Sequence, residues 1–252
     1  PDAIPTLEEL GLSESLTELA MLNSGLVLLV GPTGSGKSTA TAALVNYANE
    51  HRREHILTIE DPIEFRYESR GCLVSQREVG LHTNSFSNAL RAALREDADI
   101  VVVGEMRDRE TVRLALEAAE TGHLVFATLH TRTAAQSVDR IISIFPEAEQ
   151  TQVRMVLADT LKAVLAVSLM KRCDVKGRVQ AMEIMLVNSA IRNLIREGKI
   201  PQIPNAIQTG KAQGMCTMDD AIRDFYDQGI ISRETAEFYA SDSSPFKSGM
   251  RI

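Results

Sequence analysis

The sequence predicts an α/β domain with a mostly parallel, doubly wound sheet, followed by an all-helical segment. Three observations lead to this fold class. Short apolar runs of strand length, such as Gly25–Val30, alternate with helical patterns through about residue 180. These runs are apolar at every position, which is typical of strands buried on both faces of a parallel sheet. Residues 189–240 then show helical patterns interrupted by glycines at helix ends or turns.

Composition indicates a chain that can form a core, and it excludes some classes of function. Its 252 residues are 44% hydrophobic, enough for a sizeable core. Twenty-seven Lys and Arg against 34 Asp and Glu give a net charge of −7, which argues against a main role in coating nucleic acid or anionic lipid. Cys72, Cys173 and Cys216 lie far apart, so we expect neither a disulfide scaffold nor a cysteine-rich zinc site. The apolar runs are too short to span a membrane, and we expect no membrane insertion.

The elements follow from local patterns. A lead-in with a short helix over Ser13–Asn23, capped by Ser13, comes first. Residues 66–82 are polar and irregular, which predicts a loop or an edge hairpin. The expected strands of the first half are Gly25–Val30, His55–Ile59, Ile100–Gly104 and Leu124–Leu129, and the expected helices are Thr39–Glu54, Phe86–Arg95 and Thr111–Thr121.

The second half changes in texture. Apolar residues from Val153 to Leu165 predict a long amphipathic helix, and Arg178–Leu186 predicts a strand that closes the core. The polar last twelve residues predict a mobile tail. We therefore divide the chain into a lead-in (1–24), an α/β core (25–186), a helical subdomain (187–240) and a tail (241–252).

The strongest motif fits the phosphate-loop pattern G-x-x-x-x-G-K-[ST] completely. Its glycines let successive backbone N–H groups point at phosphate oxygens, and the following helix N-terminus favours negative charge. The lysine reaches the β- and γ-phosphates, and the serine hydroxyl ligates Mg²⁺. ATP is favoured over GTP because no N/T-K-x-D base-recognition motif occurs. The predicted nucleotide-binding residues are Gly31, Pro32, Thr33, Gly34, Ser35, Gly36, Lys37, Ser38 and Thr39.

Carboxylates follow two of the predicted strands. A phosphate-loop enzyme needs such groups to hold the Mg²⁺ shell and to orient or deprotonate water. Ile100–Gly104 runs directly into Glu105, the general form of a Walker B site. The strand His55–Ile59 is followed by a second acidic group. Its members are Glu60, Asp61 and Glu64.

Histidines and arginines are weaker candidates. His130 follows the strand Leu124–Leu129, whose carboxyl end should face the ligand, so it could sense the γ-phosphate. His123 stands at the other end of that strand. Arginines on or beside helices can act as arginine fingers in a ring or form an ordinary salt-bridged face, and the sequence leaves both open. They are Arg91, Arg95 and Arg107.

Together these motifs resemble the C-terminal motor domain of the type II/IV secretion ATPase superfamily, and in particular its pilus-retraction members. The resemblance runs from about residue 25 to residue 240. It rests on GPTGSGKST, ILTIEDPIEF, ALRAALREDADIVVVGEMRD, AAETGHLVFATLHT and AIRNLIRE. The last of these resembles a retraction-type signature. It comprises Ala190, Ile191, Arg192, Asn193, Leu194, Ile195, Arg196 and Glu197.

The resemblance implies roles for single residues. Glu64 would be the general base for water, with Glu60 and Asp61 in support. Glu105 would act as the Walker B glutamate near Mg²⁺, contacting the ion through water. His130 and His123 would belong to a histidine box that couples nucleotide state to motion. The AIRNLIRE segment would serve retraction rather than hydrolysis itself, and its apolar residues also predict a packed amphipathic helix.

The resemblance also implies a setting. The core would be RecA-like and would act in a homohexamer that hydrolyses ATP with Mg²⁺ at subunit interfaces. The motor would work on an inner-membrane pilus platform protein, with related pilus ATPases as further partners and no nucleic acid. It would lie in the cytoplasm, at the periphery of the inner membrane. A PAS-like domain of about one hundred residues would precede residues 1–24, which form its junction with the motor.

Three other functions stay open at this point. A pilus-extension or secretion ATPase of the same superfamily commonly has a four-cysteine zinc motif, which this chain lacks. A DNA translocase on the same core would show ATPase stimulation by DNA. A nucleotide-gated scaffold without catalysis would not need Lys37, Glu64 and Glu105 together.

Overall fold

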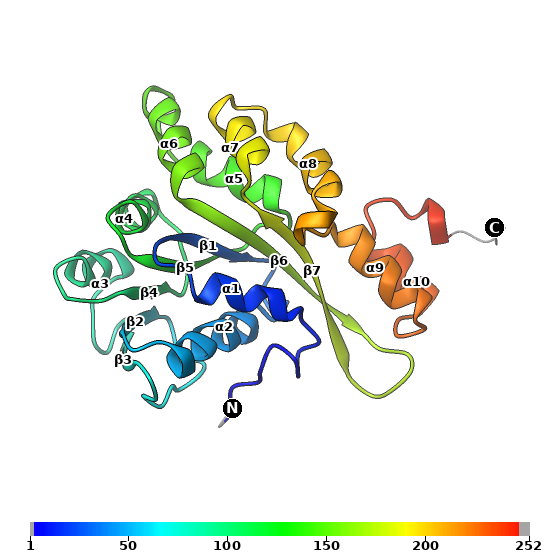
Figure 1. Ribbon diagram of the computed structural model, residues 1–252, viewed down its shortest axis with the longest axis horizontal. Helices are drawn as coiled ribbons and strands as arrows, with labels where there is room; N and C mark the ends of the chain where they lie inside the picture. Colours follow the sequence, from blue (N-terminus) through cyan, green and yellow to red (C-terminus); the bar gives the residue numbers. More distant parts are fainter. Residues whose placement is uncertain (1–2, 247–252) are drawn as a thin grey trace.

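The computed structural model describes residues 3–246 and contains one seven-stranded sheet (Figure 1). The strand order is β3-β2-β4-β5-β1-β6-β7, and every neighbouring pair is parallel except β6 and β7. The predicted mostly parallel α/β fold is confirmed. The strands are β1 (Gly25–Val30), β2 (His55–Glu60), β3 (Leu73–Glu78), β4 (Ile100–Val103), β5 (Leu124–Leu129), β6 (Leu161–Lys171) and β7 (Arg178–Leu186).

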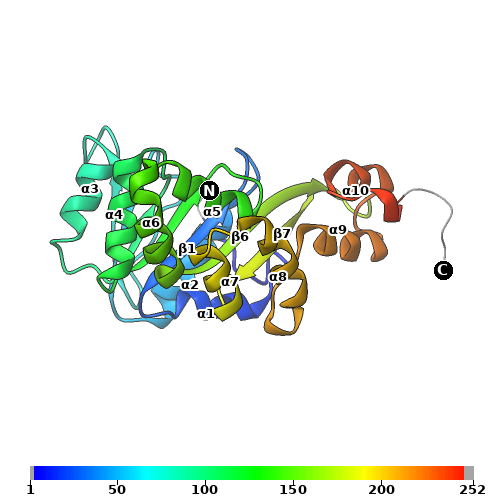
Figure 2. The same ribbon diagram turned by 90° about the horizontal axis from the view of Figure 1, so that it is seen from above.

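Helices cover both faces of the sheet. The lead-in, α1 and α2 pack on one face, and α3 to α8 pack on the other. Helices α9 and α10 lie at one end of the molecule in both ribbon views (Figures 1 and 2). The α-helices are α1 (Thr17–Ala20), α2 (Lys37–His51), α3 (Phe86–Ala93), α4 (Arg109–Glu120), α5 (Ala134–Ser143), α6 (Glu147–Thr160), α7 (Ser189–Arg196), α8 (Ile203–Thr209), α9 (Met218–Asp227) and α10 (Arg233–Tyr239).

Strand β1 shows why continuous apolar runs form the centre of the sheet. All six of its residues are buried. Leu26 and Leu28 point to the α3–α8 face, while Val27 and Leu29 point to the α2 face. Because side chains alternate across a strand, a strand with helices on both sides must be apolar at every position. In the described chain, 3–246, no helix is long and apolar enough to cross a membrane.

Two expected elements are wrong. Residues 73–78 form strand β3, which pairs in parallel with β2 at the edge of the sheet, and not a hairpin. Helix α6 ends at Thr160, whereas the prediction continued it to Leu165. Leu161 instead begins β6, which lies beside β1. The edge strand lacks an apolar run because it is half-exposed, and the start of β6 is apolar at nearly every position, so periodicity cannot distinguish helix from strand there.

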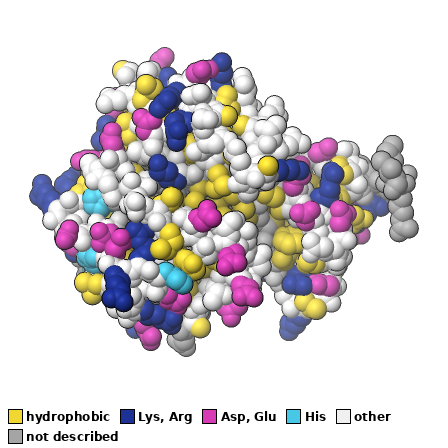
Figure 3. Space-filling view, viewed as in Figure 1, with side chains coloured by type: hydrophobic (Ala, Val, Ile, Leu, Met, Phe, Trp, Pro, Cys, Tyr) yellow, Lys and Arg dark blue, Asp and Glu magenta, His cyan; other side chains and the backbone are white. Residues whose placement is uncertain are grey.

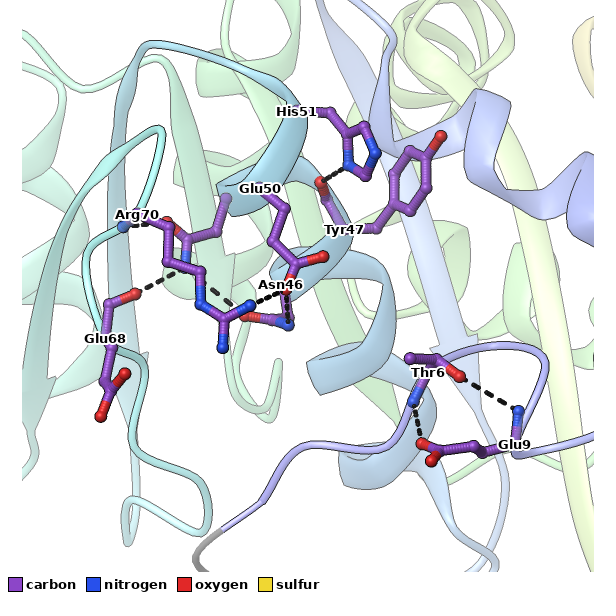
Figure 4. Close-up of polar contacts among 9 residues, drawn as sticks. Thr6, Glu9, Asn46, Tyr47, Glu50, His51, Glu68 and Arg70 are labelled. Carbon is purple, nitrogen blue, oxygen red and sulfur yellow. Dashed lines mark hydrogen bonds and ion pairs between the residues drawn. The ribbon is translucent and has the colours of Figure 1, made fainter.

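The lead-in is attached to the far end of α2. Buried Arg52 donates from Nη1 to the carbonyl oxygens of Ala20, at 2.9 Å, and Leu22, at 2.6 Å. On the surface nearby, Arg70 forms an ion pair with Glu50 of α2 (Figure 4). Helix α1 is shorter than predicted, with a 3-10 turn over Glu14–Leu16 before it.

The C-terminal helices pack in two different places. Helices α7 and α8 join the large apolar cluster on the α3–α8 face. Helices α9 and α10 form a smaller cluster with the outer part of β6 and β7. The space-filling view shows this end as a lobe set off from the main body (Figure 3). Of the tail, residues 244–246 form a 3-10 turn with Phe246 buried in this cluster, so this part is packed rather than loose; 247–252 lie outside the described residues.

Candidate active site

The phosphate loop joins β1 to α2 at the carboxyl end of the central strand. Gly31, Gly34 and Gly36 have φ values of 151°, 78° and 94°. A Cβ atom on Gly31 would lie 2.5 Å from the carbonyl oxygen of Val167, so this position accepts only glycine. The first residue of α2 is Lys37. The loop therefore wraps around the N-terminus of a helix, which is where anions bind.

Lys37 is buried and folded back over the loop. Its Nζ donates to the carbonyl oxygens of Gly31, at 2.5 Å, and Pro32, at 2.9 Å, and lies 3.5 Å from His130 Nδ1. Burial lowers the pKa of Lys37, and the carboxylates of Glu105 and Glu64 oppose this shift. The ammonium group therefore contacts two loop carbonyls and His130, and it feels the charges of two carboxylates.

The acidic group after β2 reaches the start of α2. The Ser38 hydroxyl donates to Glu64 Oε1 at 2.8 Å, although 26 residues separate the two in sequence. Glu60 holds the intervening turn, because its Oε1 accepts from Thr58 Oγ1 at 2.6 Å and from Gln76 Nε2 at 3.2 Å. Burial is the main cause that raises the pKa of Glu60, and these hydrogen bonds oppose it.

Glu105, which follows β4, contacts two basic side chains. Its Oε1 lies 2.7 Å from His130 Nε2, and its Oε2 lies 2.5 Å from Arg107 Nη2. Burial would raise the pKa of Glu105, but the hydrogen bond from Arg107 and the charge of His130 outweigh burial and lower it. Strand β5 pairs with both β1 and β4, so topology alone brings His130 to Lys37 and Glu105.

The predicted residues thus divide into two sets. Lys37, Ser38, Glu64, Glu105, Arg107 and His130 converge on one edge of the sheet. Asp61 is exposed beside them, and its charge contributes to raising the pKa of Arg107. The others lie elsewhere: His123 contacts the Ala118 carbonyl at the opposite end of β5, Arg91 pairs with Glu110 on α4, and Arg95 is exposed after α3. The role of His123 in coupling nucleotide state to motion, and those of Arg91 and Arg95 as arginine fingers, stay predictions.

Gln180 is a site residue that no motif predicts. It is buried on β7, and its Nε2 donates to the Gly36 carbonyl oxygen at 3.1 Å. A carbonyl only accepts, so the amide nitrogen must face Gly36 and Oε1 must face away. Among residues 3–246, neither Gln180 Oε1 nor buried Ser35 Oγ has a hydrogen-bond partner. Gln180 supports the phosphate loop from behind, a contact that depends on where β7 lies in the sheet.

The AIRNLIRE segment forms α7 and packs away from this edge. Ile191 and Ile195 are fully buried in the large apolar cluster, as the amphipathic pattern predicts. Its two arginines contact the end of α6: Arg192 Nε donates to the Ala158 carbonyl at 3.2 Å, and Arg196 pairs with Asp159. Cations at a helix C-terminus are stabilising. The arginines therefore help to hold α7 on the core, and the segment's part in retraction stays a prediction.

The donor set at the loop fits Mg²⁺ held together with a nucleotide. Within residues 3–246, no group of three or more His, Cys, Asp or Glu side chains is placed to hold a metal ion by itself. Magnesium usually takes one or two protein oxygens and completes its shell with phosphates and water. The Ser38 hydroxyl and the Glu105 carboxylate are oxygen donors of this kind, and Ser38 already lies at the N-terminus of α2.

Comparisons with known proteins agree with this geometry. The model of the family described as type II/IV secretion system protein matches residues 6–237. A twitching motility protein of Neisseria gonorrhoeae is 53% identical over 243 residues, which cover 96% of this chain and 65% of that protein. The type IV pilus retractation ATPase PilT of Pseudomonas aeruginosa is 54% identical over 236 residues, covering 94% and 68%.

Solved structures show the same fold. The crystal structure of the pilus retraction motor PilT with bound ADP superposes with a TM-score of 0.90 at 48% identity, over 96% of this chain and 68% of that one. The ATPase DotB of Legionella pneumophila follows with a TM-score of 0.86 at 32% identity, over 94% and 66%. The resemblance inferred from the motifs is confirmed. This chain belongs to the family of type II/IV secretion system proteins.

Proposed function

We propose that this chain is the ATP-hydrolysing motor of a machine that retracts type IV pili. The observation that carries the proposal is the convergence of Lys37, Ser38, Glu64 and Glu105 on the phosphate loop. The printed names of the relatives support the biological part, since they are a twitching motility protein and a pilus retractation ATPase. The chain spans only 65% of the first of these, so the activity of the whole protein is inferred here and not read from them.

The residues suggest a division of labour. The glycine-rich loop and Lys37 would bind the β- and γ-phosphates, with Lys37 exchanging its two backbone acceptors for phosphate oxygens. Glu64, exposed beside Ser38, is free to accept a proton from water. Glu105, kept charged by Arg107 and His130, would hold the metal shell. When bound, Mg²⁺ would neutralise charge on the phosphates.

His130 links the two parts of this site. It lies between Lys37 and Glu105, at 3.5 Å and 2.7 Å. A phosphate that draws Lys37 away from the loop carbonyls would break the contact with Nδ1 and leave the one with Nε2. His130 would thus report phosphate occupancy to the loop that follows β5. Segments that become ordered or disordered with γ-phosphate contacts are a common basis of conformational change in nucleotide-driven proteins.

The assembly is also part of the proposal. We infer a homohexameric ring, with exposed arginines such as Arg91 and Arg95 available to neighbouring subunits. The ring would act in the cytoplasm on a pilus platform protein at the inner membrane, together with related pilus ATPases. The division into a junction (1–24), a core (25–186), a helical subdomain (187–240) and a tail (241–252) belongs to the same proposal.

Phosphate release tests the enzymatic part. We expect Mg²⁺-dependent hydrolysis of ATP by the purified protein, and a fall of at least about 100-fold in kcat for Glu64→Gln, the loss typical of a removed general base. Glu237→Gln on α10 is the matched control, because in the described part of the chain Glu237 pairs only with Arg233 one helix turn away, and it should leave hydrolysis unchanged. Equal rates for wild type and Glu64→Gln would contradict the role of Glu64.

A deletion strain tests the biological part. Excess pili that do not retract would support retraction, and cells without pili would instead indicate an extension or secretion ATPase. The comparisons favour retraction, because a type II secretion system protein E of Pseudomonas aeruginosa is 41% identical over only 165 residues. Stimulation of hydrolysis by DNA at moderate salt would indicate a translocase.

A further inference from the structure

Glu183, on the opposite face of β7 from Gln180, is a half-buried carboxylate that forms no ion pair within the described residues. Within residues 3–246, no lysine, arginine or histidine forms an ion pair with it. Its position in the sheet is opposite Ala166 of β6. Buried carboxylates without a cation are unfavourable unless backbone donors surround them. The hydrogen-bond donors around Glu183 therefore indicate its structural role.

Glu183 meets the N-termini of two helices. The backbone N–H of Ala134, the first residue of α5, donates to Glu183 Oε1 at 2.8 Å. The backbone N–H of Met218, the first residue of α9, faces the same carboxylate; burial raises the pKa of Glu183, and the N–H groups of Ala134 and Met218 oppose this shift. These two N–H groups lack partners within their own helices. One side chain therefore satisfies both helix ends and meets the positive end of both helix dipoles.

The two helices belong to different parts of the molecule. Helix α5 begins four residues after His130, and its first turn is capped by Thr133, which accepts from the backbone N–H of Gln136 at 3.1 Å. Helix α9 starts the small C-terminal cluster. It is also tied to β7 directly, because Cys216 and Ile184 exchange two backbone hydrogen bonds, at 2.8 Å and 3.1 Å. Glu183 in addition connects α9 to the loop of residues 130–134.

We propose that Glu183 is a positioning residue that joins the loop of residues 130–134 to helix α9, so that phosphate occupancy sensed at His130 alters α9 and α10. The proposal rests on the proposed function, since it uses the nucleotide site described there. The element with two states is the small α9–α10 cluster, which packs apart from the main core. A physical chain of contacts connects it to the site: Lys37, His130, the 130–134 loop, Glu183 and α9.

Hydrogen exchange of the α9 amides, with and without Mg²⁺ and the slowly hydrolysed analogue ATPγS, tests the link. In the wild type we expect the analogue to change exchange in Met218–Asp227 by about fivefold or more, the lower end of usual allosteric coupling. In Glu183→Gln we expect the change to fall below about twofold. Glutamine keeps one acceptor oxygen but presents an NH₂ group to the second helix end, so one of the two contacts is lost.

Met218→Pro tests the same link without touching Glu183. Proline is accepted at the first position of a helix and removes the N–H that faces the carboxylate, together with the Met218 side chain that packs on the small cluster, so Met218→Ala controls for the lost packing. Thr217 before it is already extended, with φ −78° and ψ 156°, as a residue before proline must be. Arg233→Pro, at the first position of α10, is the matched control. We expect Met218→Pro to abolish the response of α9 and Arg233→Pro to preserve it, and nucleotide affinity to stay within about threefold in both.

Two results would overturn the proposal: a wild-type α9 that does not respond to the analogue, or a full response in both Glu183→Gln and Met218→Pro. If Glu183→Gln does not fold, Met218→Pro decides by itself. The test is separate from that of the proposed function. If α9 responds to the analogue but the protein does not hydrolyse ATP, the proposed ATPase activity is refuted and the coupling through Glu183 is supported. If the protein hydrolyses ATP but α9 does not respond, only the coupling is refuted.

Discussion

Helices α7–α8 and α9–α10, which the sequence predicts as one helical subdomain, are held in different ways. Ile195 of α7 is fully buried in the same apolar cluster as strands β1, β4 and β5. Ile222 of α9 is equally buried, but in a small cluster with the outer half of β6 and β7. The first pair of helices is therefore part of the core. The second pair is a lobe that contacts the rest through β6 and β7, including Glu183, and through the ion pair of Lys211 with Asp220.

The comparison predicts different results from the same substitution in the two places. Ile195→Ala should lower the global free energy of unfolding by about 2–5 kcal/mol, because it opens a cavity in the main core. Chemical denaturation monitored by circular dichroism measures this. A loss below about 1 kcal/mol would mean that α7 is not integrated with the core.

Ile222→Ala removes the same atoms from an equally buried site in the lobe. We expect it to destabilise α9–α10 by about 2–4 kcal/mol, visible as faster amide exchange there. Global unfolding should change by less than about 1 kcal/mol, because the lobe opens locally first. If denaturation of the whole protein shifted as much as in Ile195→Ala, the lobe would not be a separate unit.

Gln180→Leu tests the face of β7 that lies toward the phosphate loop, opposite the face whose Ala181 packs on the lobe. It removes the hydrogen bond to the Gly36 carbonyl, so we expect the Kd for ATP to rise about threefold to tenfold, the net value of one such bond. Calorimetric titration measures the Kd. The kcat should change little, because Gln180 acts through the loop and not on the reacting phosphate. A fall in kcat at unchanged Kd would contradict this positioning role.

The smallest expected effect concerns the pH dependence of Glu105. Its pKa is lowered from the ordinary 4.5, so its charged form stabilises the fold above pH 4.5, and this stability is lost as pH falls through the lower value in the folded state. His130 and Arg107 are half-exposed or more, so we expect less than about 1 kcal/mol. The difference in unfolding free energy between wild type and Glu105→Gln should shrink as the pH falls below 4.5. A difference that grows with acidity would contradict the lowered pKa.

The sequence predicts the site well where function depends on local pattern. The phosphate loop has a fixed spacing, and Glu64, Glu105 and His130 follow strands whose carboxyl ends share one edge of the sheet. Topology then brings them together. Gln180 and Glu183 could not be found in this way, because their contacts depend on the antiparallel register of β7 against β6. The half-exposed edge strand β3 also gives no clear signal, since strand propensity mainly reflects burial.

The central claim is that one edge of the sheet binds ATP through Lys37 and hydrolyses it through its carboxylates. Binding of ATP and release of phosphate, measured on the same samples of wild type, Lys37→Ala and Glu105→Gln, test it most directly. We predict that Lys37→Ala loses both binding and hydrolysis, and that Glu105→Gln binds ATP but hydrolyses it at least about 100-fold more slowly. Hydrolysis by Glu105→Gln at the wild-type rate would contradict the account.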